Sequence, residues 1–394
     1  MFEAFKEHDF RRLWITQFIS NIGSWMQTVA QGWLVYRLTD SPFLLGVVGF
    51  SASAPTILLM LPGGVLADQL DRRKLLRASQ WAQTLAAFTL SVSIFTHHIA
   101  VWQIIAASVV VGTAMSFSAP AYHAMIADLL DDRSRLPNAV AMNSLQFNTS
   151  RVIGPLLASL ALAAWGSGWC FLLNAVSFLP LIHVLGRLTD RQHRSKTLEQ
   201  RMTARLVEGF RYVRGERTVL ILLCAMMAVS LFGFPLMTLM PVVARKMFVN
   251  DAEGLGYLTG ALGTGALLAA LFLSIRTPAG DRMLRLVTAS LAMFGITIAA
   301  IPFGRVLPAT LVILVGAGAS MVIAFALMNT WIQQRVPDEV RGRVMSMYTY
   351  AFFAFIPFGN LLAGVVAENA GLTQALMVMG AGTVATAVAV AWAR

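Results

Sequence analysis

Residues 61–77 read Leu-Pro-Gly-Gly-Val-Leu-Ala-Asp-Gln-Leu-Asp-Arg-Arg-Lys-Leu-Leu-Arg and join two apolar segments. Each of those segments is long enough to cross the hydrocarbon core of a bilayer. The stretch between them is short and carries charges of both signs, which are costly within hydrocarbon. This pattern predicts two membrane-crossing helices joined by a tight, charged turn at the membrane surface.

The composition of the whole chain indicates the same class of protein. Of its 394 residues, 57% are apolar and only 12% are charged, and the mean hydropathy is +0.69. A soluble domain has about 25% charged residues. In lipid only helices and closed barrels satisfy every backbone amide, and the short alternating segments of a barrel are absent. The sequence therefore predicts an all-α membrane protein.

Apolar runs of spanning length recur along the chain, and we expect twelve transmembrane helices. Residues 1–12 are polar and lack the apolar core of a cleaved signal peptide, so we expect the first helix to be retained. The expected helices lie near residues 13–37, 42–66, 75–96, 101–127, 138–164, 169–186, 218–243, 255–275, 284–303, 308–334, 344–367 and 372–392.

The positive charges are distributed unevenly about these helices. The expected outer loops hold only four of the 30 Lys and Arg residues, and Arg151 lies within a span; the other 25 lie in inner segments. By the positive-inside rule this asymmetry predicts a multi-pass protein of the bacterial inner membrane with both termini in the cytoplasm. The net charge of +11 then reflects topology and contact with membrane lipid, so we expect no nucleic-acid partner.

The sequence offers no support for enzyme chemistry. It has no glycine-rich phosphate loop, no metal-ligand spacing and no catalytic pair of carboxylates in a soluble module, so we expect no cofactor and no metal. The two cysteines, Cys170 and Cys224, lie in or near spans and suggest no disulfide framework. Without a nucleotide-binding domain, the chain cannot drive transport with ATP by itself.

The chain divides into two halves around a basic segment. We expect a six-helix bundle at 1–186, a cytoplasmic basic linker with an amphipathic helix at 187–217, and a second six-helix bundle at 218–394. The linker could cover the bundle or form a regulatory docking site. Internal echoes support a repeat: Leu45-Gly46 recurs as Leu255-Gly256, 210 residues later. Such repeats are typical of secondary transporters.

The Gly64-Val65-Leu66-Ala67-Asp68 run followed by Arg72-Arg73 resembles the loop signature of the major facilitator superfamily. The start of the chain and Arg151 to Pro155 resemble the branch that contains the enterobactin exporter and the macrolide efflux proteins. The resemblance implies the fold of that superfamily, with two six-helix pseudo-repeats and alternating access. It also implies a conformational latch formed by Gly64, Asp68, Arg72 and Asp128, in which Arg72 pairs with Asp68 and with Asp128. The alternative is that Arg72 is only a topology anchor.

A second resemblance lies in the fifth expected helix. Gly154 and Pro155 match the glycine and proline positions of the superfamily's antiporter motif, which implies export by exchange. The alternative is that these small residues only let two helices pack closely. Asp71, where the usual loop has Gly, could cap the third helix or compete with Asp68 for Arg72.

Polar and aromatic side chains within the spans are candidates for a substrate cavity. Five of them recur every three or four residues in the first helix and form one stripe, which would be costly against lipid. Arg151, deep within a span, could bind an anionic or carbonyl-bearing group, or instead hold the kinked backbone near Pro155. The candidates for the cavity are Gln17, Asn21, Ser24, Thr28, Gln31, Asn148, Arg151, Asn329, Trp331 and Tyr348.

These features predict a secondary transporter that exports an amphipathic organic solute, a drug-like compound or a siderophore. Proton antiport is implied by the resemblance alone, because no carboxylate lies at mid-span to carry a proton. His123 and Arg151 are the candidates for proton coupling. We expect a monomer with a small-molecule substrate, membrane lipid and protons as its partners. Two alternatives remain: a lysophospholipid flippase or an importer on the same fold, and a membrane receptor or scaffold that transports nothing.

Overall fold

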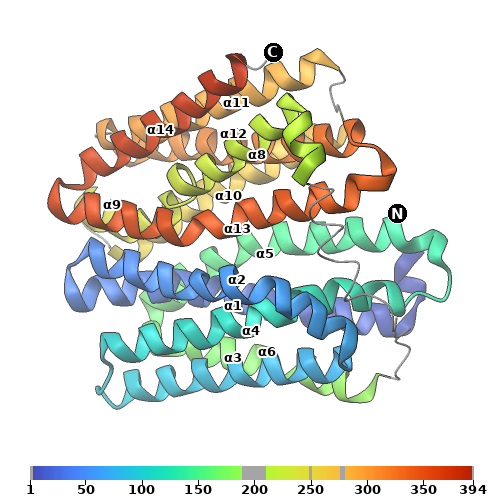
Figure 1. Ribbon diagram of the computed structural model, residues 1–394. Helices are drawn as coiled ribbons and strands as arrows, with labels where there is room; N and C mark the ends of the chain where they lie inside the picture. Colours follow the sequence, from blue (N-terminus) through green and yellow to red (C-terminus); the bar gives the residue numbers. More distant parts are fainter. Residues whose placement is uncertain (1–2, 189–209, 248–250, 276–279, 305, 393–394) are drawn as a thin grey trace. The chain divides into compact units, whose positions relative to one another are not determined.

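The computed structural model describes residues 3–188, 210–247, 251–275, 280–304 and 306–392, and the regular structure within them is helical (Figure 1). This confirms the all-α class that composition predicted. The chain divides into two compact units: Met1–Asp40 with Ser51–Ser195, and Ser41–Phe50 with Lys196–Arg394. Most of the expected linker, 187–217, lies outside the described residues.

The first unit holds helices whose ends follow local sequence signals. Pro137 stands in the first turn of α5, where its missing N–H costs nothing. Asp40 ends α1 in the left-handed conformation, with φ of 50°, and donates its N–H to the carbonyl of Tyr36. The helices are α1 (His8–Thr39), α2 (Pro42–Gln69), α3 (Arg72–Phe95), α4 (Val101–Asp128), α5 (Leu136–Ala164) and α6 (Ser167–Arg187), preceded by the short η1 (Glu3–Lys6). The first part of α2, 42–50, is grouped with the second unit.

The second unit repeats the packing of the first. In the first unit α1 packs on α5 and α6, and α3 packs on α4 and α6; in the second, α8 packs on α13 and α14, and α11 packs on α12 and α14. The two packing schemes are the same when helices are matched in chain order, as expected for a pseudo-repeat. The helices of the second unit are α8 (Arg217–Phe232), α9 (Leu236–Met247), α10 (Asp251–Ile275), α11 (Asp281–Ala300), α12 (Leu307–Arg335), α13 (Asp338–Asn369) and α14 (Leu372–Trp392).

The seventh expected span, 218–243, is built from two helices instead of one. The break between α8 and α9 lies at Gly233, Phe234 and Pro235, because proline cannot donate the N–H that would continue the helical ladder. The N–H groups of Gly233 and Phe234 both donate to the carbonyl of Val229, at 2.7 and 3.0 Å, and so close the end of α8.

Ten helical segments of the described chain are long and apolar enough to cross a membrane, against the twelve expected; α8 and α9 count as one of them. Helices α1 and α3 occupy the places of the two remaining spans. Both carry many polar side chains, among them buried Gln80 and Gln83 of α3, which lower their hydropathy. Length and composition alone therefore do not identify them as spans.

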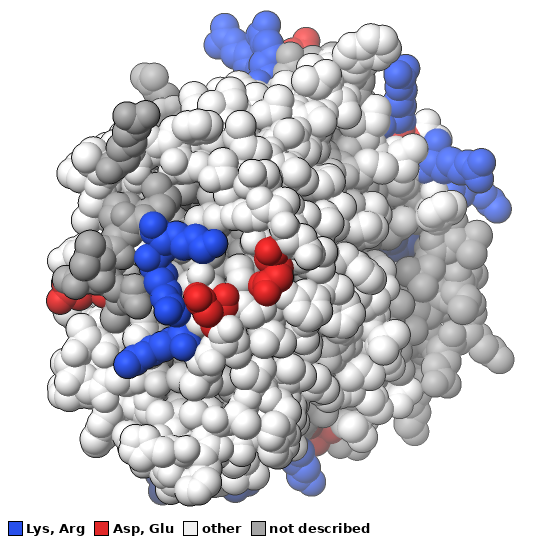
Figure 2. Space-filling view, turned by 90° about the vertical axis from the view of Figure 1, so that its left-hand side faces the viewer, with Lys and Arg blue, Asp and Glu red and all other residues white. Residues whose placement is uncertain are grey.

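The surface is suited to lipid. Large apolar side chains such as Leu58, Trp102 and Val312 are more than two-thirds exposed, where hydrocarbon can cover them. In the face shown in Figure 2, uncharged side chains cover most of the surface, and the charged ones form a small group with a few others at the rim.

Close helix packing depends on glycines at particular positions. In α12, a Cβ on Gly318 would lie 1.9 Å from the backbone carbonyl oxygen of Leu262 in α10. Gly316, half a turn earlier, has more room: its Cβ would lie 3.4 Å from the Cγ2 of Thr297. Of the two glycines, Gly318 is the one that brings two helix backbones into direct contact.

We expect Gly318→Ala to destabilise the second unit by about 1–3 kcal/mol, because the added methyl group forces α10 and α12 apart. Gly316→Ala is the matched control, with an unchanged or slightly raised stability, since alanine favours the helix by about 1 kcal/mol. Thermal unfolding of the purified protein in detergent measures both. Equal midpoints for the two variants would contradict this account of the contact.

Candidate functional site

The turn between α2 and α3 is held by Asp71. Its carboxylate accepts hydrogen bonds from the backbone N–H groups of Arg73 and Lys74, at 3.0 and 3.3 Å, and so caps α3. The Arg73 side chain also pairs with this carboxylate, at 3.0 Å. Partial burial raises the pKa of Asp71, but the hydrogen bonds from Arg73 and Lys74 outweigh it and the net shift is downward. Of the two roles considered for Asp71, the structure shows the cap.

Arg72 points to a different partner. Its Nη1 lies 2.6 Å from Oδ2 of Asp128, at the end of α4, and both side chains are about 15% exposed. The structure thus brings together two of the four predicted latch residues. Gly64 lies in α2 with open space where a Cβ would stand. Asp68 belongs to the same helix, but its side chain lies outside the described residues.

Further polar contacts at the same end of the first unit were not predicted. Arg73 donates to the backbone carbonyl of Leu188, and so ties the end of α6 to the start of α3. Arg135 pairs with Glu7 at 2.5 Å, and the N–H of Ala4 donates to Asn138 at 3.0 Å. These pairs join residues far apart in the sequence, and no local pattern marks them.

The polar stripe of α1 falls into two parts. Gln17 donates to Asn21 at 2.8 Å, and the hydroxyls of Ser24 and Thr28 donate to backbone carbonyls one turn earlier. These four side chains are half-buried or exposed within the first unit. Gln31 instead donates to buried Ser108 of α4 at 3.0 Å, so it belongs to the packing of the unit.

A buried polar contact lies on another face of α1. The amide of Asn174 in α6 donates to Oε1 of Gln27 at 2.7 Å, and both side chains are less than 10% exposed. Gln27 lies outside the stripe, so its spacing gave no signal of this pair. The contact helps to fix α1 against α6.

Arg151 lies beside aromatic rings. Its guanidinium carbon is 5.7 Å from the ring centre of Trp25 in α1, and Trp25 in turn contacts Phe147 edge-on at 5.9 Å. Asn148, one turn before Arg151, donates to the carbonyl of Ser144 in its own helix. The arrangement presents a half-buried cation next to an aromatic wall, a pairing that suits an anionic or carbonyl group with an apolar body.

Gly154 marks the crossing of α5 and α1. A Cβ there would lie 2.5 Å from the Cβ of Trp25 and 2.9 Å from the carbonyl oxygen of Ile22, and Pro155 beside it is buried. Gly359 of α13 packs against α8 in the same way: a Cβ there would lie 2.6 Å from the carbonyl oxygen of Leu231. In each half the glycine lies where two helices pack closely.

The remaining cavity candidates lie in the second unit. Asn329 accepts a hydrogen bond from Gln333 at 2.7 Å, and Arg335 lies 6.0 Å from the ring centre of Trp331. The hydroxyl of Tyr348 is buried and donates to the carbonyl of Phe325 at 3.3 Å. Tyr348 therefore contributes to the packing of α13 on α12.

The candidates for proton coupling stand in different surroundings. His123 is exposed on α4, with its ring 5.9 Å from that of Tyr122, whereas Arg151 is half-buried. Within the described part of the chain, His, Cys, Asp and Glu side chains form no group of three that could hold a metal ion.

Comparison with known proteins identifies the family to which the chain belongs. The family described as transmembrane secretion effector matches residues 1–394. The chain is 26% identical over 378 residues to the staphyloferrin A transporter of Staphylococcus aureus, covering 94% of this chain and 92% of that protein. It is 26% identical over 368 residues to the multidrug efflux pump Tap of Mycolicibacterium fortuitum, covering 89% and 87%. Macrolide efflux protein A of Streptococcus pyogenes is 21% identical over 384 residues, covering 94% and 92%.

Solved structures share the fold. The nucleoside transporter NupG superposes with a TM-score of 0.74 at 15% identity, covering 98% of this chain and 99% of that one. A bacterial homologue of the lysosomal transporter Spinster gives 0.73 at 14% identity, covering 100% and 96%. With twinned helical units and a match along its whole length, the chain belongs to the transmembrane secretion effector family of major facilitator superfamily transporters.

Proposed function

We propose that this protein exports an amphipathic organic solute across the bacterial inner membrane by alternating access, in exchange for protons. The observation that carries the proposal is the half-buried Arg151 over Trp25, next to the polar stripe of α1. The relatives support the direction, since two of them are named as efflux proteins.

The substrate class follows from this chemistry. A guanidinium beside aromatic rings attracts a carboxylate or a carbonyl group while the rings accept an apolar body. The stripe residues Gln17, Asn21, Ser24 and Thr28 add hydrogen-bonding groups along the same helix. Together they suit a drug-like compound or a carboxylate-bearing siderophore.

The latch of the proposed cycle is the Arg72–Asp128 pair, with Gly64 and Asp68 contributing from α2. A charge-assisted pair of this kind stabilises one conformation by about 1.5–3 kcal/mol, and opening it permits the other. We propose that both termini lie in the cytoplasm, which places the pair on the cytoplasmic side.

Everted membrane vesicles from cells that overproduce the protein test the function directly. With an acid interior, we expect a macrolide or a carboxylate siderophore to accumulate in the lumen while the luminal pH rises, as protons leave in exchange. Radiolabelled substrate and a quenched acridine dye measure the two fluxes. A silent dye during proven accumulation would contradict proton exchange, and accumulation of lysophospholipid alone would indicate a flippase.

We expect Arg72→Gln and Asp128→Asn each to lower transport by about tenfold or more, because each breaks the Arg72–Asp128 ion pair of the latch. Lys74→Gln, an exposed neighbour in the same turn, is the control and should keep transport within about twofold. Vesicle uptake per amount of folded protein is the measurement. Full activity in both latch variants would remove the latch from the mechanism.

Arg151→Lys should lower transport by about two- to thirtyfold, the range of a cation–π contact of about 0.5–2 kcal/mol, because lysine loses the planar group over Trp25. Arg37→Lys is a matched control: Arg37 lies 4.8 Å from the ring centre of Trp33 on the same helix as Trp25, but at its exposed end. Uptake of substrate at several concentrations measures both variants. Wild-type uptake by Arg151→Lys would reduce Arg151 to a structural role.

A further inference from the structure

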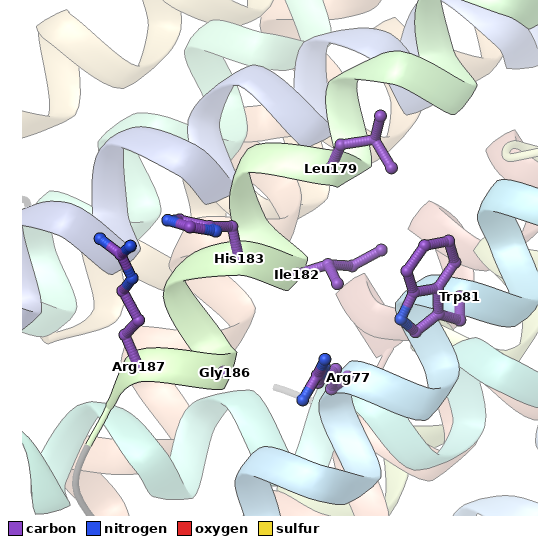
Figure 3. Close-up of a pocket in the computed structure, with 7 residues that line it drawn as sticks. All are labelled: Arg77, Trp81, Leu179, Ile182, His183, Gly186 and Arg187. Carbon is purple, nitrogen blue, oxygen red and sulfur yellow. The ribbon is translucent and has the colours of Figure 1, made fainter.

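A groove lies between α3 and α6 at the end of the first unit that carries the α2–α3 turn (Figure 3). Its volume is about 420 Å³. None of the predicted transport residues lines it. Its lining residues are Arg77, Trp81, Leu179, Ile182, His183, Gly186 and Arg187.

Gly186 lines the groove without a side chain. A Cβ on Gly186 would lie 3.5 Å from Nη1 and 3.6 Å from Cζ of Arg77, so the guanidinium lies against the bare backbone of α6. Ile182, one turn earlier, is only 5% exposed and forms the floor. A larger residue at position 186 would fill the space that the groove occupies.

The described residues give the groove positive charge without a counter-charge. None of the described residues that line it is acidic, and neither Arg77 nor Arg187 forms an ion pair with a described residue. Their neighbours differ: Arg72 and Arg73 are paired with Asp128 and Asp71. Figure 3 shows Arg187 and His183 on one side of α6 and the Arg77 guanidinium on the other side of Gly186. These cationic groups around one groove form a site for an anionic group with several oxygens, since arginine binds phosphate with paired N–H donors.

Polarity changes along the groove. On α3, Arg77 and Trp81 are one turn apart, and Arg77 is the nearer to the start of the helix. On α6, Leu179, His183 and Arg187 follow at one-turn intervals, and Arg187 is the last residue of the helix. The positive charges therefore lie at the start of α3 and the end of α6. Trp81 and Leu179 lie deeper in the span and are each 43% exposed. A free phosphate would leave this apolar end uncovered, whereas a ligand with an anionic head and a hydrocarbon chain matches both ends.

We propose that this groove is a binding site for an anionic phospholipid. The anionic headgroup lies over Gly186, with Arg187 and His183 as donors on one side and Arg77 on the other, and one acyl chain lies along Trp81 and Leu179. Because the two arginines belong to different helices, the headgroup contacts both α3 and α6 next to the turn that holds Arg72. Bound lipid therefore stabilises the first unit.

Native mass spectrometry of the full-length protein, delipidated in detergent, tests the site. We expect phosphatidylglycerol to be retained about tenfold better than phosphatidylcholine, and Arg77→Gln/Arg187→Gln to abolish that preference. The matched control is Arg282→Gln/Arg285→Gln, which removes two exposed arginines from α11, the counterpart of α3, and should keep it. Equal retention of the two lipids by the wild type, or an unchanged preference in the groove variant, would overturn the proposal.

A single substitution and a second ligand make the test specific to this groove. His183→Glu adds a carboxylate on the groove wall without removing either arginine, and we expect it to abolish the preference too; an unchanged preference there counts against the site even where the double variant fails to fold. Thermal unfolding with phosphatidylglycerol or with inorganic phosphate distinguishes a lipid ligand from a free phosphate ion. Stabilisation by phosphatidylglycerol but not by millimolar phosphate supports a lipid, and equal stabilisation by both would overturn it.

Discussion

The absence of water from the bilayer core is the constraint on which the rest of this structure depends. Every backbone N–H and C=O within the hydrocarbon must find a partner inside the protein, and only a helix provides one for each residue along a single span. Where the ladder is interrupted, as at Gly233 and Pro235, the freed groups need close neighbours. Gly359 of α13 packs directly against the carbonyls of the adjacent α8 residues Ser230 and Leu231.

The same constraint decides where polar side chains stand. Gln27 and Asn174 share a hydrogen bond in the interior of the first unit, and Arg151 lies over an aromatic ring. Arg77 and Arg187 depart from this pattern because they lie near helix ends, where long side chains reach the interface. Charged side chains thus lie in two kinds of place: at the ends of the spans, and at a few interior positions such as Arg151 where a neighbouring group interacts with the charge.

The elements of the fold could be predicted from the sequence because hydropathy is a property of each segment taken alone. Most of the expected helix positions agree with the structure, and the Arg72–Asp128 contact followed from a recognised loop signature. The break at Pro235 was missed because the run 218–243 is uncharged and mostly apolar, so hydropathy does not mark an interruption.

Contacts between helices were harder to foresee. The bond from Arg73 to the carbonyl of Leu188, the Gln27–Asn174 pair and the groove beside Gly186 all depend on how each helix is rotated about its axis. Hydropathy does not specify that rotation. For the same reason the spacing of the polar residues in α1 predicted a stripe, but not the packing of Gln31 onto Ser108.

The attachment of the first residues to α5 has a consequence for how the protein is made. Glu7 and Ala4 find their partners, Arg135 and Asn138, about 130 residues later in the chain. At a synthesis rate of roughly 5–20 residues per second, these partners leave the ribosome about 5–20 seconds after the first helix. Until then Phe10 and Leu13, which are fully buried in the finished protein, lack part of their cover. A nascent chain that stalls before the fifth helix therefore exposes apolar side chains near its amino terminus. Quality-control proteases can recognise this exposed apolar surface and so distinguish the stalled chain from the folded protein.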